Sequence, residues 1–401
     1  MSAAPGRSQA SSHRSPQGEA TPVSRIWAGF AGTWRAVLGD LGVLVLLFGG
    51  GVVYSFFYPL PYRQEIVQQA PVVVVDQDRS ALSRQITRYV QAHPAVLVLE
   101  VTPDVARAHE LLWRNQASGA LVLPAGLNAT VLGGRAAEVA LVGHGAYLLL
   151  NKAALTGLAE AVGTVSAGVE IKRLSASTPS ERVALEQRQP LQLNPVPLFN
   201  VREGYGAYLV PGVAVLIVQQ TLLMAVAMLM GSWHEAGGRP LEHDLGSFTG
   251  VWLAWTSAAA MHCAYWFGFV LWFQDYPRGG NLAGLAGFTL LFAGTLAGLA
   301  LLIGSLFRTR ERSVQLMIGL AMPILFVAGL AWPGQALPPL LQGLRWLLPS
   351  TAGIQGFVAL NQLGAHWSEI ANEVWVLSAL LPGFTVLAAW RWRAKAAPPT
   401  A

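Results

Sequence analysis

Long apolar stretches dominate the second half of this chain and constrain its fold more than any other feature. A helix of about 20 apolar residues crosses the hydrocarbon core of a membrane. Five stretches in the C-terminal half meet or approach that length, and a sixth lies alone near the N-terminus. We therefore predict an α-helical membrane protein with six transmembrane helices, arranged as one plus five. In chain order, the predicted spans are Leu41–Leu60, Tyr208–Met230, Gly250–Phe273, Leu282–Phe307, Val314–Trp332 and Val374–Ala389.

The composition agrees with a membrane protein. Hydrophobic residues make up 53% of the chain and charged residues 12%, whereas soluble domains carry about 25% charged residues. The basic residues behind the net charge of +5 are scattered, without interleaved aromatic residues, so we expect no nucleic-acid partner. The single cysteine, Cys263, lies inside a predicted span, and the sequence has no disulfide framework or zinc-binding spacing.

A polar segment of domain size separates the first predicted span from the other five. Residues 1–24 are rich in Ser, Ala, Pro and Gln, which is typical of a disordered tail. Residues 25–60 hold either a short amphipathic helix on the membrane surface or an extension of the first span, and then the span itself. Residues 61–205 form an inserted domain, and residues 206–395 form the membrane domain with the other five helices.

The inserted segment alternates between strand and helix patterns. The β-branched run Val72–Val75 indicates a buried strand, and Ser80 or Asp78 can cap a helix over Ala81–Ala92. The other predicted elements are strands at 96–101, 120–123 and 139–142, a helix at 102–115 and a long helix at 148–174. This order predicts a small α/β domain. We interpret its aspartates as turn and capping residues, because no pair has the spacing of a catalytic motif.

The basic residues predict the orientation in the membrane. Short cytoplasmic loops carry an excess of Lys and Arg. With the N-terminus inside, the inner flanks hold the cluster Arg308–Arg312, whereas the short outer loops hold only Arg278 and Arg345. We therefore expect a multi-pass protein with both termini in the cytoplasm and residues 61–205 on the opposite, periplasmic side.

Few polar side chains interrupt the predicted spans. Gln219, Gln220 and His262 lie near the middle of their helices, where a buried polar group needs a partner. They either line a possible substrate path or hold neighbouring helices together. No Asp, Glu, Lys or Arg lies deep in a predicted span, which argues against ion-coupled or proton-coupled transport. The sequence also lacks the GxxxxGK(S/T) loop that binds nucleotide phosphates.

Residues 333–368 are too interrupted to form a span. Prolines break this segment and leave two short apolar pieces, at 340–348 and 353–363. Irregular backbone at membrane depth must be covered by protein or line a cavity. The sequence therefore predicts short re-entrant helices in this part of the membrane domain.

A polar segment, Ser232–Ser247, follows the second predicted span and reads SWHEAGGRPLEHDLGS. Its pattern allows a short helix around Leu241–Leu245. On the cytoplasmic side it is a natural docking element for a soluble partner. Its histidines and loosely spaced carboxylates are a weak metal signal, so we expect no metal there. The candidate contact residues are Glu235, Arg239, Glu242, His243 and Asp244.

Further motifs occur in a fixed order along the chain: VVVVDQDRS at Val72–Ser80, NVREGYGAYLVPGVAVLIVQQ at 200–220, GSWHEAGGRPLEH at 231–243, GSLFRTRERSVQL at 304–316 and LLPSTAGIQGF at 347–357. In order and spacing they resemble ABC-2 type exporter permeases, especially the subfamily with a large periplasmic domain between the first two transmembrane helices. The resemblance covers nearly the whole chain from about Arg25. It implies the permease subunit of an ATP-driven exporter without an ATPase site of its own.

The resemblance also implies roles for the 232–247 segment. In such permeases the loop after the second helix fits a groove on the ATPase and carries a Glu, a Gly-Thr pair and a second Glu. Glu235 and Glu242 match the two acids, whereas Arg239 and Pro240 stand where Gly-Thr is expected.

The partners that the resemblance implies are a cytoplasmic ABC ATPase and a second permease copy or a homologue. Gram-negative relatives add a periplasmic membrane-fusion adaptor and an outer-membrane channel. ATP and Mg²⁺ are bound by the ATPase, and this chain is expected to bind no cofactor. The implied location is a bacterial inner membrane. The apolar predicted spans favour amphiphilic or hydrophobic cargo.

Two alternatives remain at the level of sequence. A membrane receptor or assembly scaffold without ATPase coupling has the same layout of a membrane half with an external insertion. A membrane enzyme acting on lipid needs a polar catalytic cluster near the interface, and the sequence shows none. The response of an ATPase to changes at Glu235 and Glu242 separates a transporter from a scaffold.

Overall fold

The computed structural model describes residues 21–63, 66–175, 200, 204–238 and 241–394. The chain divides into two compact units by internal contacts. One unit comprises residues 61–206, and the other combines residues 1–60 with residues 207–401.

The unit of residues 61–206 is built on a four-stranded sheet with the strand order β2-β1-β3-β4. Strand β1 pairs in parallel with β2 and β3, and β3 pairs antiparallel with β4. The strands are β1 Ala70–Asp76, β2 Val96–Thr102, β3 Gly119–Leu123 and β4 Ala140–Gly143. The helices are α4 Ala81–Ala92, α5 Val105–Trp113, α6 Leu127–Leu132 and α7 Leu148–Ser175. The other elements follow the order that the sequence predicts, and α6 is an additional helix that it did not predict.

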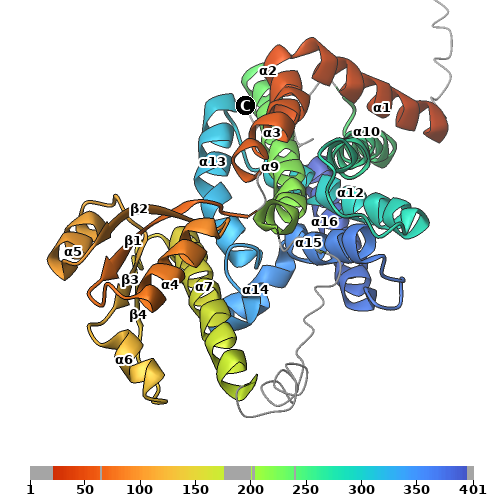
Figure 1. Cartoon of the computed structure of the whole chain (residues 1–401). Coiled ribbons are helices and arrows are strands. Elements are labelled where there is room, and N and C mark those ends of the chain that lie inside the picture. The colour runs from red at the N-terminus through yellow and green to blue at the C-terminus, as the bar shows by residue number, and fades with distance from the viewer. Residues whose placement is uncertain (1–20, 64–65, 176–199, 201–203, 239–240, 395–401) are drawn as a thin grey trace, which may run out of the picture. The chain divides into compact units, whose positions relative to one another are not determined.

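The central strand β1 explains the two-sided core. Val72 and Val74 pack with residues of α4 and α7 on one face of the sheet. Val73 and Val75 pack with α5 on the other face (Figure 1). A parallel strand covered on both faces is apolar at every position rather than at alternate ones. The unbroken run of valines is therefore the expected pattern for this position in the sheet.

The aspartates of this unit satisfy backbone groups. Asp104 accepts from Ala106 N at 2.8 Å at the start of α5, and Asp76 accepts from Arg79 N at 2.8 Å in the turn after β1. Ser80, rather than Asp78, caps α4, with a reciprocal bond between its backbone and the Ser83 side chain. These contacts agree with the interpretation of the aspartates as turn and capping residues.

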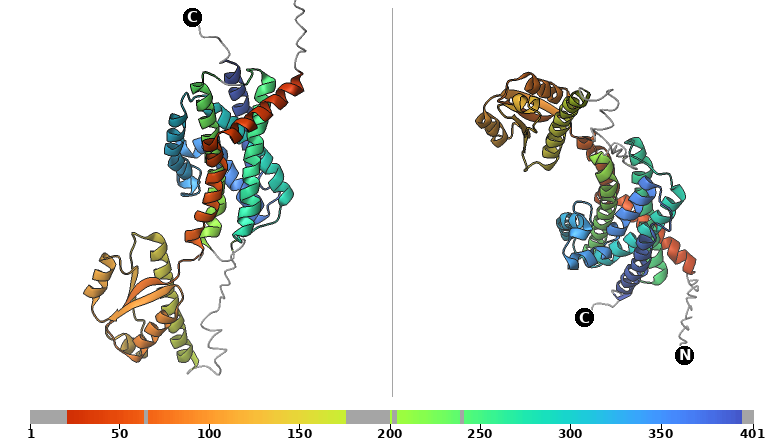
Figure 2. Two further views of the ribbon diagram at one scale, coloured as in Figure 1. Left: turned by 90° about the horizontal axis from the view of Figure 1, so that it is seen from above. Right: turned by 60° about the horizontal axis from the view of Figure 1, so that its bottom comes forward.

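The second unit is a bundle of helices. Its first apolar helix comprises α2 Leu41–Leu44, a π-helical segment Val45–Gly49 and α3 Gly50–Phe57. The other long helices are α1 Pro22–Gly39, α9 Tyr205–Glu235, α10 Leu245–Cys263 with its continuation to α11 Leu271–Phe273, α12 Leu282–Gly304, α13 Arg310–Val327 and α16 Ala371–Ala394. Figure 2 shows most of them running alongside one another, with α1 crossing the bundle at an angle. Helix α1 begins at Pro22, inside the stretch expected to be a tail.

Four helices in the described residues are long and apolar enough to cross a membrane: Leu41–Tyr62, Tyr205–Glu235, Leu282–Gly304 and Ala371–Arg393. They confirm the prediction of a helical membrane protein. The other two predicted spans coincide with α10–α11 and α13, which are helical but are not among these four.

The proline-broken segment between α13 and α16 forms short helices. They are Gly334–Ala336, α14 Pro339–Leu344, Arg345–Leu347, α15 Pro349–Val358 and Ala359–Leu363. Helix α15 lies deep in the bundle, where Phe357 stacks on Phe267 with ring centroids 4.1 Å apart. Gly353 and Gly356 face the rings of Phe292 and Phe288 so closely that a Cβ at either position would clash. These glycines let the short helix approach α12.

Candidate functional site

The first four residues of the polar 232–247 segment belong to the last turn of α9. The helix continues to Glu235, so only residues 236–244 connect α9 to α10. Gly237 donates its N–H to His234 O, and Gly238 donates to Trp233 O at 2.9 Å. This paired pattern satisfies the last carbonyls of a helix and requires a left-handed residue. Gly237 supplies it with a φ of 88°.

The start of α10 is fixed by Asp244. Its carboxylate accepts from Gly246 N at 2.7 Å and from Ser247 N at 3.1 Å. A side chain that bonds the first free N–H groups in this way sets the beginning of a helix. The expectation of a short separate helix around Leu241–Leu245 is therefore wrong, because Leu245 is the first residue of α10 and residues 241–244 are not helical.

Glu235 lies beside an ion pair that joins two distant parts of the chain. Its Oε1 accepts from the backbone N of Arg310, at the start of α13, at 3.2 Å. The Arg310 guanidinium donates to both carboxylate oxygens of Asp40, with 2.8 Å between Nη2 and Oδ1, and to Ser232 Oγ at 3.0 Å. The Arg310 guanidinium holds the pKa of the Asp40 carboxyl below its usual value, because these hydrogen bonds favour the charged form.

Glu242 and His243 contact other elements of the bundle. The Glu242 carboxylate lies 3.9 Å from the Arg25 guanidinium of α1, and its backbone oxygen accepts from Trp392 Nε1 of α16 at 3.2 Å. The ring of His243 packs near that of Trp392. The pair of Arg25 and Glu242 is exposed, so its own stabilisation is about 1 kcal/mol or less.

Helix α1 packs tightly across α10. A Cβ on Gly29 would clash with the backbone of Ser247, and one on Gly250 would clash with the backbone of Ile26. Trp34 Nε1 also donates to Ser257 Oγ of α10 at 3.1 Å. The small residues allow two backbones to approach closely, so α1 and the start of α10 form one packed element.

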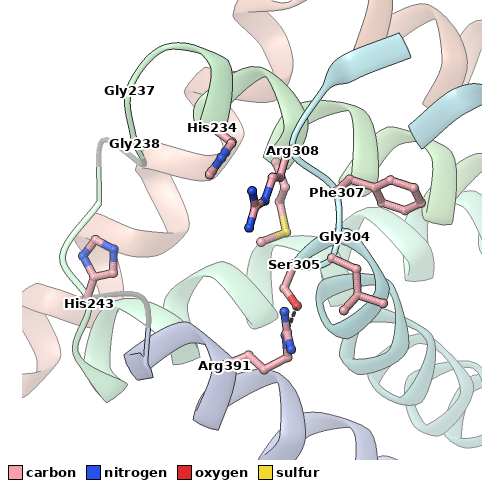
Figure 3. Close-up of a pocket in the computed structure, with 11 residues that line it drawn as sticks. His234, Gly237, Gly238, His243, Gly304, Ser305, Phe307, Arg308 and Arg391 are labelled. Carbon is pink, nitrogen blue, oxygen red and sulfur yellow. Dashed lines mark hydrogen bonds between the residues drawn. The ribbon is translucent and has the colours of Figure 1, made fainter. Parts of the chain in front are cut away.

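A cavity of about 650 Å³ opens beside the 232–247 segment (Figure 3). It lies among the end of α9, the loop between α12 and α13, and the end of α16. Arg391 Nε donates to Ser305 Oγ at 2.7 Å across this space. The lining residues are Met230, His234, Gly237, Gly238, His243, Gly304, Ser305, Leu306, Phe307, Arg308 and Arg391.

The structure brings the four described candidates of the segment, Glu235, Glu242, His243 and Asp244, to one end of the bundle. Arg239 lies outside the described residues. Sequence reasoning missed Asp40 as a partner of this segment. The sequence feature that could have revealed Asp40 is its position as a lone carboxylate directly before the first apolar run.

The polar residues inside the bundle join helices. Gln219 Oε1 of α9 accepts from Ser350 N of α15 at 2.9 Å. His262 Nδ1 of α10 lies 3.3 Å from Thr221 Oγ1 of α9. The ring of His262 also occupies the space that a Cβ on Gly51 would fill. Gln220 differs in degree: among the described residues both polar atoms of its buried amide lack a hydrogen-bond partner, whereas Gln219 and His262 each have only one such atom, Nε2.

Comparison with known proteins identifies the family. The sequence model for the ABC-2 family transporter protein matches residues 41–390. A search of curated proteins finds no match. The matched range contains the whole first apolar helix, the inserted unit, the 232–247 segment and α9 to α13, and it runs nearly to the end of α16. The chain therefore belongs to the ABC-2 transporter family.

Proposed function

We propose that this chain is the permease subunit of an ATP-driven exporter that moves amphiphilic or hydrophobic compounds out of the cytoplasm or inner membrane. The family implies an ABC ATPase partner in general, and the sequence has no phosphate-binding loop of its own. ATP and Mg²⁺ are bound by that partner, and hydrolysis there supplies the energy. A second copy of the chain or a homologue completes the membrane part.

The contacts of the 232–247 segment carry this proposal. Glu235 reaches α13 through Arg310, and Arg310 reaches the start of the first apolar helix through Asp40. Glu242 reaches α1 and α16 through Arg25 and Trp392. A partner that pushes on this segment therefore moves several helices together, which is the requirement for coupling a soluble motor to a membrane path.

We further propose six spans, with α10–α11 and α13 completing the four apolar helices. Arg310 and Arg391 lie at the same end of the bundle as the 232–247 segment, because Arg310 donates to Ser232 and Arg391 lines the same cavity as His234 and His243. By the excess of basic residues on the cytoplasmic side, this end faces the cytoplasm together with both termini. Residues 61–205 then lie in the periplasm, available to a membrane-fusion adaptor that leads to an outer-membrane channel.

This topology is tested by labelling introduced cysteines. Cys263 is the only native cysteine, so a Cys263→Ala background is free of thiols. Gln116 and Ala236 are exposed positions in the two units. With a membrane-impermeant maleimide on intact spheroplasts, Gln116→Cys is expected to react at once and Ala236→Cys only after permeabilisation. The reverse labelling would overturn the proposed orientation.

Within the bundle, we assign Gln219 and His262 to helix packing and Gln220 to the substrate path. The first two residues have partners on neighbouring helices. The amide of Gln220 is buried without one among the described residues, and an unpaired amide in an apolar environment is costly unless something binds it. Cargo with a polar group supplies such a partner during transport.

The coupling role is tested with the ATPase partner in reconstituted vesicles. Glu235→Gln and Glu242→Gln remove the charges of the segment, and Glu311→Gln is a matched control at an exposed position on α13. We expect the double variant Glu235→Gln/Glu242→Gln to lower permease-stimulated ATP hydrolysis about fivefold, corresponding to a loss of about 1 kcal/mol, and the control to stay unchanged. Equal stimulation by all variants would instead favour the scaffold alternative.

A further inference from the structure

The loop between α12 and α13 separates two hollows that share a wall. The first is the cavity of about 650 Å³ beside the 232–247 segment, and the second has a volume of about 600 Å³. Both are lined by Leu306, Phe307 and Arg308, and the second adds Arg312, Gln315 and Leu316. We call the two together the arginine groove. Neither lining contains an Asp or a Glu.

The arginines of this groove differ from their neighbour Arg310. Arg310 is neutralised by Asp40. Within the described ranges, no carboxylate lies at ion-pair distance from Arg308, Arg312 or Arg391. Arg391 does have a neutral partner, Ser305 Oγ, which leaves its charge uncompensated. Two guanidinium groups line each hollow, and such a pair favours a phosphate, which accepts hydrogen bonds from both.

Apolar side chains lie in the same groove as these charges. Leu306 is 59% exposed and Leu316 is 51% exposed. The loop directly follows α12, one of the four helices apolar enough to cross a membrane. A purely acidic peptide from a soluble partner would pair with the arginines and leave both leucines uncovered. A phospholipid covers both, because its phosphate and its acyl chains are joined in one molecule.

We propose that the arginine groove binds an anionic phospholipid of the surrounding membrane. The phosphate lies between Arg308 and Arg391, and the acyl chains lie over Leu306 and Leu316. The bound lipid bridges the α12–α13 loop and the end of α16, next to the segment that is proposed to receive the ATPase. If the proposed topology holds, this phospholipid belongs to the cytoplasmic leaflet; its binding to the groove does not depend on that topology.

The test measures lipid retention by the full purified chain in detergent micelles. Labelled phosphatidylglycerol is offered with phosphatidylcholine of the same acyl chains as competitor. We expect the wild-type chain to retain phosphatidylglycerol preferentially. Arg308→Gln and Arg391→Gln are each expected to reduce that preference about fivefold, since a basic residue near an anionic lipid surface contributes about 1 kcal/mol.

Two further variants keep this test decisive. Arg393→Gln removes the same charge from the same helix at an exposed position outside the groove, and it is expected to retain the lipid preference. Arg391→Lys keeps the charge, so it is expected to retain more of the preference than Arg391→Gln. Recovery with lysine excludes a folding defect as the cause of the loss, which size-exclusion chromatography of each variant checks independently.

Other outcomes would overturn the proposal. Equal retention of the two lipids by the wild-type chain would show that no anionic lipid site exists. Displacement of phosphatidylglycerol by inorganic phosphate alone would assign the groove to a free anion. Loss of ATPase association in Arg308→Gln, with lipid retention unchanged, would assign it to the protein partner. The lipid measurement requires no ATPase, so its failure and a failure of the proposed function are distinguishable.

Discussion

Arg310 binds both carboxylate oxygens of Asp40, although the two residues are 270 positions apart in the chain. The pair ties the residue before the first apolar helix to the first residue of α13. Hydrogen bonds to charged groups contribute about 1.5–3 kcal/mol each. Glu235 also accepts from Arg310 N. A substitution that breaks the pair of Asp40 and Arg310 is therefore expected to alter this contact with the 232–247 segment.

We predict that Asp40→Asn and Arg310→Gln are each destabilising and that their effects are not additive. Residues in direct contact show interaction energies of about 0.5–3 kcal/mol. For a chain of 401 residues, the entropy of unfolding per residue means that each 1 kcal/mol lowers the unfolding midpoint by roughly 1 °C. Thermal unfolding of the two single variants and the double variant in detergent measures the interaction. Strict additivity of the three shifts would show that the pair contributes nothing to stability.

The same pair predicts a dependence of stability on pH. Hydrogen bonds from Arg310 lower the pKa of Asp40 from its ordinary value of 3.8. A carboxyl with a depressed pKa in the folded state contributes stability that is fully present above its unfolded pKa and is lost as the pH falls through the folded value. The gap in unfolding midpoint between wild type and Asp40→Asn is therefore expected to be constant near neutral pH and to shrink below about pH 4. A gap that widens on acidification contradicts this prediction.

Because α1 and α10 cross in close contact, we predict that the glycines at the crossing cannot be replaced by larger residues without a loss of stability. Gly250→Ala places a methyl group against the backbone of Ile26, and overpacking of this kind costs about 1–3 kcal/mol. Gly268→Ala is the matched control, because its Cβ would meet open space in the same helical run. Limited proteolysis near Pro22 is expected to be faster in Gly250→Ala only. Equal protection of α1 in both variants would show that the close approach is not needed.

The ring of His262 packs on Gly51, so we predict that removing this ring rescues part of the stability lost when a side chain is added at Gly51. Gly51→Ala brings its new methyl group into the imidazole ring, whereas Gly49→Ala makes only ordinary contact with Val45. We expect Gly51→Ala to lower the unfolding midpoint and His262→Ala to restore part of the loss when combined with it. If His262 instead serves mainly to contact cargo, the combined variant keeps the full loss and changes transport selectivity.

The elements that sequence reasoning predicted well depend on local patterns. The run Val72–Val75 and the Ser80 cap define β1 and the start of α4 within a few residues of chain. The long apolar runs likewise identify the helices, since their periods and lengths are readable in one segment. The prediction of a short helix around Leu241–Leu245 was wrong because the Asp244 side chain caps the start of α10, which begins only at Leu245.

The contacts between residues of the candidate site cannot be predicted from such local patterns. Glu235 and Arg310 are 75 residues apart, and Glu242 and Trp392 are 150 apart. One sequence contains no signal for such pairing, because it arises from the packing of helices. The cluster around Arg310 was informative about orientation only. The structure divides that cluster into one neutralised arginine and two neighbours, Arg308 and Arg312, that have no acidic partner among the described residues.

The dependence on an ATPase partner tests the central claim most directly. The full chain is reconstituted in vesicles with and without its ABC ATPase partner, sought by copurification in mild detergent, and export of a fluorescent amphiphile is followed on ATP addition. We predict transport and stimulated ATP hydrolysis only when both proteins are present, and loss of both in Glu235→Gln/Glu242→Gln. Active export by the chain alone, or ATP hydrolysis by the partner that never responds to the chain, would contradict the account.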